Sequence, residues 1–420
     1  MSKWEWKKLG EVCEIHGRIG WQGLTRKEYR SSGDYLLITG INFTDNNTVD
    51  YESCVYVDKE RYVQDQYIQV RENDLLITKD GTLGKLALIA EKPPKPATLN
   101  GGLFVIRNPD NKIYPKFLMY VMKSEPFRKM IRKSITGSTV PHLTQNMLVN
   151  FPIPIPSLSE QRSIVKQLDE KLTKIEKIKT NAETNLKNAK ELFETTLEKE
   201  LNPLSRHSER SEESCADLPS GWEWEILKNL GKTQTGSTPS TSKPQYWDGD
   251  IPFLKPSNIS YSGELDLNQI QYLSPSGAEK SRIIPRNSVL MVCIGASIGK
   301  VGLVEELVTC NQQINAITPK KDVDVQYLYY ALRTGTFQNK MKREAGQATL
   351  PIINKSKWEN LKIPLPPLSV QKEIIARLDK LSENVKRLEA NYKQIIANCD
   401  ELKKSILKKT FEGDSRSSRE

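Results

Sequence analysis

The chain has 420 residues and a net charge of +10, and charged side chains make up 27% of it. This length allows two or three domains with cores of their own. No apolar run reaches the length of a membrane span, and we expect no signal peptide, so composition indicates a cytoplasmic protein that contacts no membrane. The positive charge favours a polyanionic partner, although a lysine-rich solvated surface would give the same excess.

Residues 1–151 are expected to form a first globular domain. This region contains glycine turns and apolar, β-branched runs such as DYLLITG (Asp34 to Gly40) and DLLIT (Asp74 to Thr78). Short apolar runs bounded by turn residues are typical of buried strands. The region is therefore predicted to be a mixed α/β domain.

A helical segment, 152–201, is predicted to follow. PIPIPSLSEQ opens it with prolines that disfavour helix. Ser157 then fits a helix cap, with Glu160 completing a capping box. An apolar stripe from Ile164 to Leu197 continues at helical spacing.

Residues 202–219 are predicted to be a polar linker, because they are charged and aperiodic. A second globular domain, 220–361, follows the linker. Its NSVLMVCIGASIGKVGLV from Asn287 corresponds to NDLLITKDGTLGKLALI from Asn73 in the first domain. The two domains thus share a skeleton, while the segments Gly17 to Asp34 and Thr235 to Ser262 have diverged.

The segment 362–412 repeats the first helical segment. KIPLPPLSVQKEIIARLD from Lys362 matches PIPIPSLSEQRSIVKQLD from Pro152 at a constant shift of 210 residues. Ser369 is the expected cap, and apolar residues from Ile374 to Ile406 step by four and three, which is a heptad seam. A polar tail, 413–420, is expected to end the chain.

The two helices have matched lengths and matched seams, so we expect them to pack on each other as an antiparallel coiled coil. The alternative is that each helix pairs with another molecule, because heptads do not name the partner. The chain would then read domain, helix, domain, helix, with a pseudo-twofold internal repeat. The fold class is α+β.

Signals for catalysis or metal binding are weak. The six cysteines are scattered, with no CxxC pair, and are interpreted as buried free thiols. GASIGK (Gly295 to Lys300) is one residue short of a phosphate-binding loop and is read as a hairpin, like GTLGK (Gly81 to Lys85). The three histidines fit no hydrolase signature, and His142 corresponds to Ile352 in the other domain. We therefore predict no catalytic residue and no metal site.

Several of these segments together resemble one family. PIPIPSLSEQ and IPLPPLSVQ, each closing a globular domain and opening a long helix, look like the central repeats of the specificity subunit of type I DNA restriction-modification enzymes. GSTPSTSKPQYWDGDIPFLKPSNI (Gly236 to Ile259), GASIGKVGLV, DGTLGKLALI and GSTVPHLTQNMLVNFPIPIP are similar to segments of that family's target recognition domains.

The resemblance implies a non-catalytic subunit that recognises a bipartite, asymmetric double-stranded DNA target, one half-site per domain. The helices would hold the domains apart and dock two adenine methyltransferase subunits, and restriction and motor subunits would join them. No cofactor is expected in this chain; S-adenosylmethionine, ATP and Mg²⁺ would be used by the partners. The alternatives are a coiled-coil protein adaptor that does not bind DNA, and a recognition module for a methyltransferase of another type.

DNA-contacting residues are predicted from side-chain chemistry, because Arg and Lys read guanine, Asn and Gln read adenine, and hydroxyls and cations hold phosphates. Trp247 is instead interpreted as a core residue beside a turn. The predicted contacts are Arg18, Trp21, Gln22, Arg26, Lys79 and Lys85 in the first domain, and Ser237, Thr238, Ser240, Lys243, Tyr246, Lys255, Ser257, Asn258 and Lys300 in the second.

Overall fold

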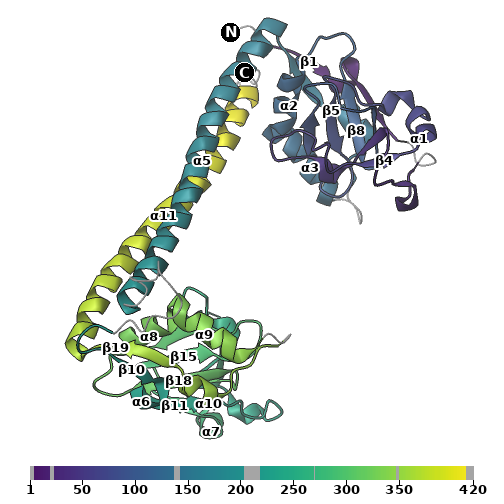
Figure 1. The fold of residues 1–420 in the computed structure, drawn as a ribbon. Coiled ribbons are helices and arrows are strands. Elements are labelled where there is room, and N and C mark those ends of the chain that lie inside the picture. Colours follow the sequence, from purple (N-terminus) through teal and green to yellow (C-terminus); the bar gives the residue numbers. More distant parts are fainter. Residues whose placement is uncertain are drawn as a thin grey trace. The chain divides into compact units, whose positions relative to one another are not determined.

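The computed structural model describes residues 4–18, 23–136, 142–202, 218–268, 270–346 and 350–412. The chain folds into two compact units, Met1–Ala182 with Gln394–Glu420, and Glu183–Lys393. Each unit holds one globular domain and parts of both long helices, α5 (Leu158–Leu201) and α11 (Leu368–Glu412) (Figure 1). Within the described ranges, no helix is both long enough and apolar enough to cross a membrane.

In the described part of the first domain, the two larger sheets share a core. The larger sheet is antiparallel and has the order β2-β8-β5-β6; the smaller has the order β4-β3-β7, with β3 and β7 parallel. Helices α1, α2, α3 and α4 accompany these sheets. The bounds are β2 (Glu14–Gly17), β3 (Tyr35–Ile38), β4 (Val55–Val57), β5 (Leu75–Thr78), β6 (Leu86–Leu88), β7 (Ala97–Leu99), β8 (Leu103–Arg107), α1 (Lys59–Val63), α2 (Pro115–Lys123), α3 (Glu125–Thr136) and α4 (Gln145–Val149).

The apolar run in β5 is explained by burial on both faces of the larger sheet. Leu76 belongs to the core between the two sheets, whereas Leu75 and Ile77 belong to a second core that includes Phe117 of α2. Alternate residues of a strand point to opposite faces. A strand covered on both sides must therefore be apolar throughout, as the sequence DLLIT indicates.

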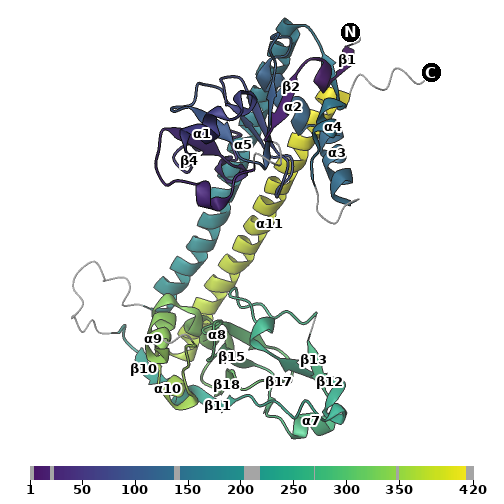
Figure 2. The ribbon, with the colours of Figure 1, turned by 90° about the vertical axis from the view of Figure 1, so that its right-hand side faces the viewer.

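The second domain repeats this arrangement. Its antiparallel sheet has the order β11-β18-β15-β16, which matches β2-β8-β5-β6 strand for strand, and α8 packs against it as α2 does in the first domain (Figure 2). The other sheet has the order β13-β12-β17-β14. The bounds are β11 (Gly231–Thr235), β12 (Trp247–Leu254), β13 (Gln271–Leu273), β14 (Ile283–Ile284), β15 (Ser288–Val292), β16 (Val301–Val304), β17 (Val308–Cys310), β18 (Ile314–Pro319), α6 (Leu227–Leu230), α7 (Pro275–Glu279), α8 (Val325–Arg333), α9 (Gly335–Ala345) and α10 (Lys355–Glu359).

The proline-rich segments before the long helices form short strands that pair with the first strand of each domain. β9 (Pro152–Ile155) pairs with β1 (Glu5–Lys8), and β19 (Lys362–Leu365) pairs with β10 (Glu223–Ile226), in equivalent antiparallel registers. Proline cannot donate to a ladder, so two-stranded edges are where it is tolerated. Each domain thus has its first strand bonded to its last, directly before the long helix.

The two long helices begin at equivalent positions, but different residues precede their first turns. The Glu160 amide donates to Ser157 Oγ at 3.3 Å, which confirms the predicted cap, but the Glu160 carboxylate accepts from Trp4 Nε1 at 2.9 Å instead of completing the capping box. The cap predicted at Ser369 is wrong. α11 begins at Leu368, so Ser369 lies inside the first turn, and the 210-residue shift places Pro367 opposite Ser157.

The helices pack antiparallel within each unit, as predicted, and the pairing is intramolecular. In the first unit, Lys179 Nζ lies 2.7 Å from Asp400 Oδ1, and Phe411 of α11 is buried with its ring 5.7 Å from that of Phe117. In the second unit, Arg377 Nη2 lies 2.6 Å from Glu200 Oε2. The early part of one helix therefore meets the late part of the other.

The heptad prediction is confirmed only in part. Ile374, Leu378 and Val385 of the expected seam are buried, but Leu402 is 50% exposed. Near the end of α11, burial shifts to Leu407 and Phe411, which enter the core of the first domain. Packing against a domain therefore replaces the coiled-coil seam there.

A buried glutamine joins each long helix to its own domain. Gln371 Oε1 accepts from the Asp324 amide at 2.8 Å, while Nε2 donates to the carbonyls of Pro366 at 2.8 Å and Asp322 at 3.3 Å. Gln161 makes the equivalent three bonds in the first unit, to residues 114, 156 and 112. Each glutamine thereby satisfies backbone groups at the start of both the domain helix and the long helix.

We predict that Gln371→Ala destabilises the chain by about 2–4 kcal/mol, because it leaves a buried amide and two carbonyls without partners. Urea denaturation of the full chain would measure this. Gln394→Ala is the matched control, since Gln394 is exposed on the same helix and should change stability by less than about 0.5 kcal/mol. Equal midpoints for the two variants would contradict the structural role of Gln371.

Candidate nucleic-acid interface

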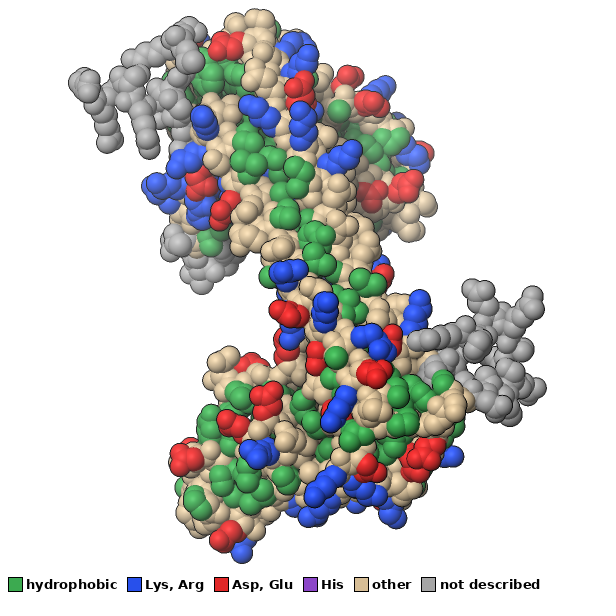
Figure 3. All heavy atoms as spheres, turned by 90° about the vertical axis from the view of Figure 1, so that its left-hand side faces the viewer, with side chains coloured by type: hydrophobic (Ala, Val, Ile, Leu, Met, Phe, Trp, Pro, Cys, Tyr) green, Lys and Arg blue, Asp and Glu red, His purple; other side chains and the backbone are tan. Residues whose placement is uncertain are grey.

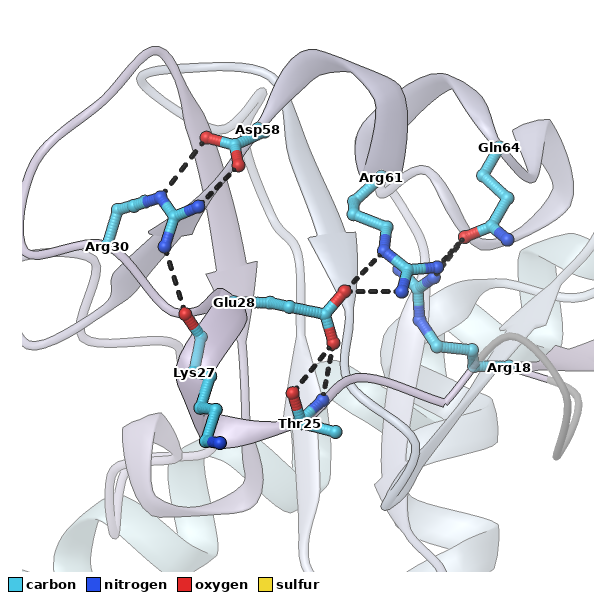
Figure 4. A network of polar contacts seen from close by, with 8 residues as sticks. All are labelled: Arg18, Thr25, Lys27, Glu28, Arg30, Asp58, Arg61 and Gln64. Carbon is cyan, nitrogen blue, oxygen red and sulfur yellow. Dashed lines mark hydrogen bonds and ion pairs between the residues drawn. The ribbon is translucent and has the colours of Figure 1, made fainter.

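The described part of the divergent segment in the first domain is anchored to α1 by a polar network (Figure 4). Glu28 accepts from the Thr25 amide at 2.8 Å and from Arg61 Nε at 2.7 Å. Arg30 makes a two-point contact with Asp58, at 2.8 and 3.3 Å. These bonds hold residues 23–30 against the domain although the segment has little regular structure.

The hydrogen bond from the Thr25 amide, reinforced by Arg61, lowers the pKa of the Glu28 carboxyl to about 2. A lowered carboxyl pKa means that the interaction is present above the unfolded pKa and is lost as pH falls through the folded value. The link is therefore intact at neutral pH.

We predict that Arg61→Met speeds amide exchange in residues 23–30 a few-fold, because it removes both hydrogen bonds from this partly exposed guanidinium to Glu28. Hydrogen exchange read by mass spectrometry would measure the change. Arg26→Met is the control, since the Arg26 side chain is exposed and lies on the same segment. Acceleration by both variants alike would show that Arg61 is not the anchor.

The six residues of the first domain that were predicted to contact DNA differ in their exposure. Arg18 is buried, and its guanidinium donates to the Leu99 carbonyl at 3.0 Å and to Gln64 Oε1 at 3.3 Å, so it supports the interior instead of presenting a group to a ligand. Arg26 is exposed. The predictions for Trp21 and Gln22 lie outside the described residues.

Lys79 and Lys85 flank the β5–β6 hairpin. Lys79 Nζ lies 4.7 Å from the centre of the Phe104 ring, and Lys85 is exposed. Gly81 has φ +70° and Gly84 has φ +77°, a backbone region that favours glycine. The equivalent GASIGK segment also joins two antiparallel strands, β15 and β16, which confirms the hairpin interpretation and removes the phosphate-loop alternative.

In the second domain, the predicted contacts between β11 and β12 lie in one loop. Thr238 Oγ1 donates to Gln312 Oε1 at 2.8 Å, and Lys243 Nζ lies 5.5 Å from the centre of the Tyr246 ring. Ser237 and Ser240 use their carbonyls internally, as acceptors from Ser281 Oγ and Trp247 Nε1.

Trp247 packs edge-on against Phe253, with ring centres 5.3 Å apart. The next residue, Asp248, has φ +61°. The structure therefore places Trp247 beside a turn, as interpreted from the sequence, but Trp247 is half-buried and lies at the edge of the fold, so the core part of the interpretation is wrong.

A second group of predicted contacts surrounds the turn before Asn258. Lys255 and Ser257 are exposed, and Lys300 Nζ donates to the Pro256 carbonyl at 3.2 Å. Asn258 is buried: its Oδ1 accepts from the Lys255 amide at 2.8 Å and its Nδ2 donates to the Asp266 carbonyl. Asn258 thus shapes this turn, while Lys255, Ser257 and Lys300 surround it.

Sequence analysis did not identify two exposed apolar side chains near these turns. Tyr261 is 72% exposed with Lys300 Nζ 5.1 Å from its ring centre, and Ile41 is 89% exposed. Ile41 precedes Asn42, which accepts from the Thr39 amide as Asn258 accepts from the Lys255 amide. The shared asparagine turn was the available signal, because it places Ile41 where the second domain has Ser257.

The cysteines described by the structure are buried and free: Cys13, Cys54, Cys293, Cys310 and Cys399. Cys215 lies outside the described residues. Burial raises the pKa of the Cys13, Cys293 and Cys310 thiols to about 12, so these thiols are protonated and poor metal ligands at neutral pH. No cluster of three potential metal ligands occurs among the described residues.

Comparison with known proteins identifies the repeated domain. A family model described as the type I restriction modification DNA specificity domain matches residues 1–186 and 219–397. The chain belongs to this family. Members are DNA sequence-recognition subunits, so the chain has a recognition role and catalysis belongs to partner subunits. The adaptor and other-methyltransferase alternatives are not favoured.

Individual relatives agree with the family assignment. The MjaIX specificity subunit of Methanocaldococcus jannaschii is 31% identical over 194 residues, 43% of each chain. The putative MjaX specificity subunit of the same organism is 24% identical, covering 98% of this chain and 94% of its own. The EcoBI specificity subunit of Escherichia coli is 24% identical, covering 82% of this chain and 74% of its own.

Solved structures agree on the fold. A chain from a type I R-M system, studied for complex assembly and conformational transition, has a TM-score of 0.76 at 22% identity over 98% of both chains. The HsdS subunit from Thermoanaerobacter tengcongensis has a TM-score of 0.59 at 22% identity, over 98% of this chain and 97% of its own.

Proposed function

We propose that each globular domain reads one half of a split DNA target, and that partner subunits methylate adenine and cleave the DNA. One observation supports the proposal. The sheet β2-β8-β5-β6 of the first domain matches the sheet β11-β18-β15-β16 of the second, while the segments between the strands differ. A shared scaffold with different loops is expected of two domains that recognise different DNA sequences. Different readers imply an asymmetric target, because identical readers would favour a palindrome.

The exposed cations and hydroxyls of these segments have the chemistry for reading DNA. Arg26 and Lys85 in the first domain, and Lys243, Lys255 and Ser257 in the second, are exposed. Lysine and arginine neutralise phosphates and release counterions, so the affinity for DNA should fall steeply with salt. The chain would act in the cytoplasm, where a bacterial or archaeal genome is accessible.

Two equivalent apolar pairs on the long helices support docking of two copies of one partner. Ile178 and Leu388 are 53% and 39% exposed, and Leu192 and Leu402 are 52% and 50% exposed. Each pair is related by the 210-residue shift of the repeat. Apolar side chains are visible on the helical part of the surface in Figure 3.

Exposed apolar side chains that recur at repeated positions suit a protein partner. We propose that two methyltransferase subunits bind the helices and that restriction and motor subunits join them. S-adenosylmethionine, ATP and Mg²⁺ would then bind to the partners.

Exchanging residues 235–262 for the corresponding segment of another family member should change one half of the methylated motif and leave the other half unchanged. The segment contains the loop before β12 and the turn at Asn258, both in the second domain. The test is to express the chain with the methyltransferase subunit encoded beside it and to map methylated adenines across a defined genome. A change in both halves would contradict one half-site per domain.

Removing one heptad from each long helix should shorten the unread gap between half-sites by about three base pairs. α5 has 44 residues and α11 has 45. Seven residues of helix span about 10 Å, and B-DNA rises about 3.4 Å per base pair. Methylation mapping gives the gap directly. An unchanged gap in a folded, active double deletion would show that helix length does not set the spacing.

A further inference from the structure

A cationic pocket lies in the first domain, and Lys85 is the one predicted DNA contact in its lining. Its volume is about 410 Å³. It is formed by the loop between Phe43 and Asn47, the β5–β6 hairpin from Leu83 to Leu86, and helices α2 and α3. We infer that this pocket binds a phosphate group.

The lining of the pocket is strongly positive. Lys85, Lys123, Arg128 and Arg132 contribute to it, whereas Asp45 is the one carboxylate in that lining. Arg132 is engaged by Glu125, a neighbour on α3. Cations that converge on a concave surface from a hairpin and two helices form a site for a multivalent oxyanion.

Lys123 is fixed at the inner side of this pocket. Its ammonium donates to Asn47 Oδ1 and lies 5.6 Å from the centre of the Tyr120 ring. Asn47 has φ +61°, and its Nδ2 donates to the Leu86 carbonyl at 3.1 Å. Asn47 therefore connects Lys123 to the hairpin that carries Lys85.

Burial, with Arg128 and Lys116 adding to it, lowers the pKa of Lys123 to about 8. Asp169 opposes this shift and Lys403 adds to it. The positive charge around Lys123 thus exceeds the negative charge. A bound phosphate would reverse the balance and raise the pKa of Lys123.

The second domain shows that the fold does not require this cluster. At the 210-residue shift, Gln338 stands where the first domain has Arg128, and its Nε2 donates to the Leu332 carbonyl at 2.6 Å. Arg333, equivalent to Lys123, donates to Tyr329 Oη at 2.8 Å and lies 3.6 Å from Glu194. The hollow beside Arg333 is lined by three carboxylates, Glu194, Glu264 and Glu389, as well as by three further cations, Lys190, Lys386 and Lys393. The excess of cations over carboxylates is therefore larger in the first domain's pocket, where Asp45 is the one lining carboxylate.

A phosphate could come from the DNA backbone or from a small phosphate compound. The DNA source rests on the proposed function, while the small-molecule source does not. Arg128→Gln tests both, because it installs the residue of the second domain at an exposed position and should not disturb folding. Lys129→Gln is the matched control: it removes one exposed charge from the next residue of α3, outside the pocket lining.

The first measurement is pyrophosphate binding to the full chain, by calorimetry at constant ionic strength, with acylation of Lys123 at pH 8 read by mass spectrometry. Bound pyrophosphate should slow acylation of Lys123, because a higher pKa leaves less free amine. We expect Arg128→Gln to weaken pyrophosphate binding about tenfold and Lys129→Gln to leave it unchanged. This result would identify a small-phosphate site.

The second measurement is DNA affinity at several salt concentrations. If the ligand is a backbone phosphate, Arg128→Gln should reduce the salt slope by about one and Lys129→Gln should not. Wild-type chain that binds DNA, with both variants equal to it for DNA and pyrophosphate, would overturn the pocket inference. Wild-type chain that binds pyrophosphate through Arg128 but no DNA would support the pocket and contradict the proposed function.

Discussion

The structure depends on how two long amphipathic helices bury their apolar faces. A helix of 44 residues cannot bury its whole apolar face on one small domain. A coiled coil of two helices leaves the apolar side chains at its two ends uncovered. The ends are instead buried in the domain cores. Leu197 and Leu201 of α5 join the core that contains Ile374, and Leu407 and Phe411 of α11 join the core that contains Leu168. Each domain core therefore requires residues from both helices.

This constraint explains which parts of the repeat are alike. From residue 114 to 201 the two copies keep a constant shift of 210, and this stretch holds the buried glutamines and the contacts of Tyr120 with Asp169 and of Tyr330 with Asp379, at 2.5 and 2.8 Å. Burial and the neighbouring carboxylate raise the pKa of both phenols, so the tyrosines stay donors at neutral pH. The loops outside this stretch do not connect a long helix to its domain, so they can differ without loss of that connection.

The divergent segments rely on polar contacts, although Leu254 and Ile259 of the second segment are also buried in a domain core. In the first domain, Glu28 and Arg61 hold the loop on α1; in the second, Asn258 and Lys300 shape the turn before Tyr261. Exposed ion pairs in these segments, such as that of Arg30 with Asp58, can be replaced one at a time, because each contributes little to the free energy of folding. Recognition surfaces can thus change while the scaffold remains stable.

The sequence alone determined the order of domains and helices, the repeat, and the hairpin at Gly81, because apolar periodicity and glycine positions act locally. Tertiary structure decided the rest. Arg18 and Asn258 have the side chains of DNA readers but are buried, since a loop's neighbours fix its exposure. The cap expected at Ser369 was wrong because α11 already begins at Leu368. The Lys123 pocket was not found by sequence analysis because Lys85 is distant in the chain from the stretch between Lys123 and Arg132, and only packing brings the two together.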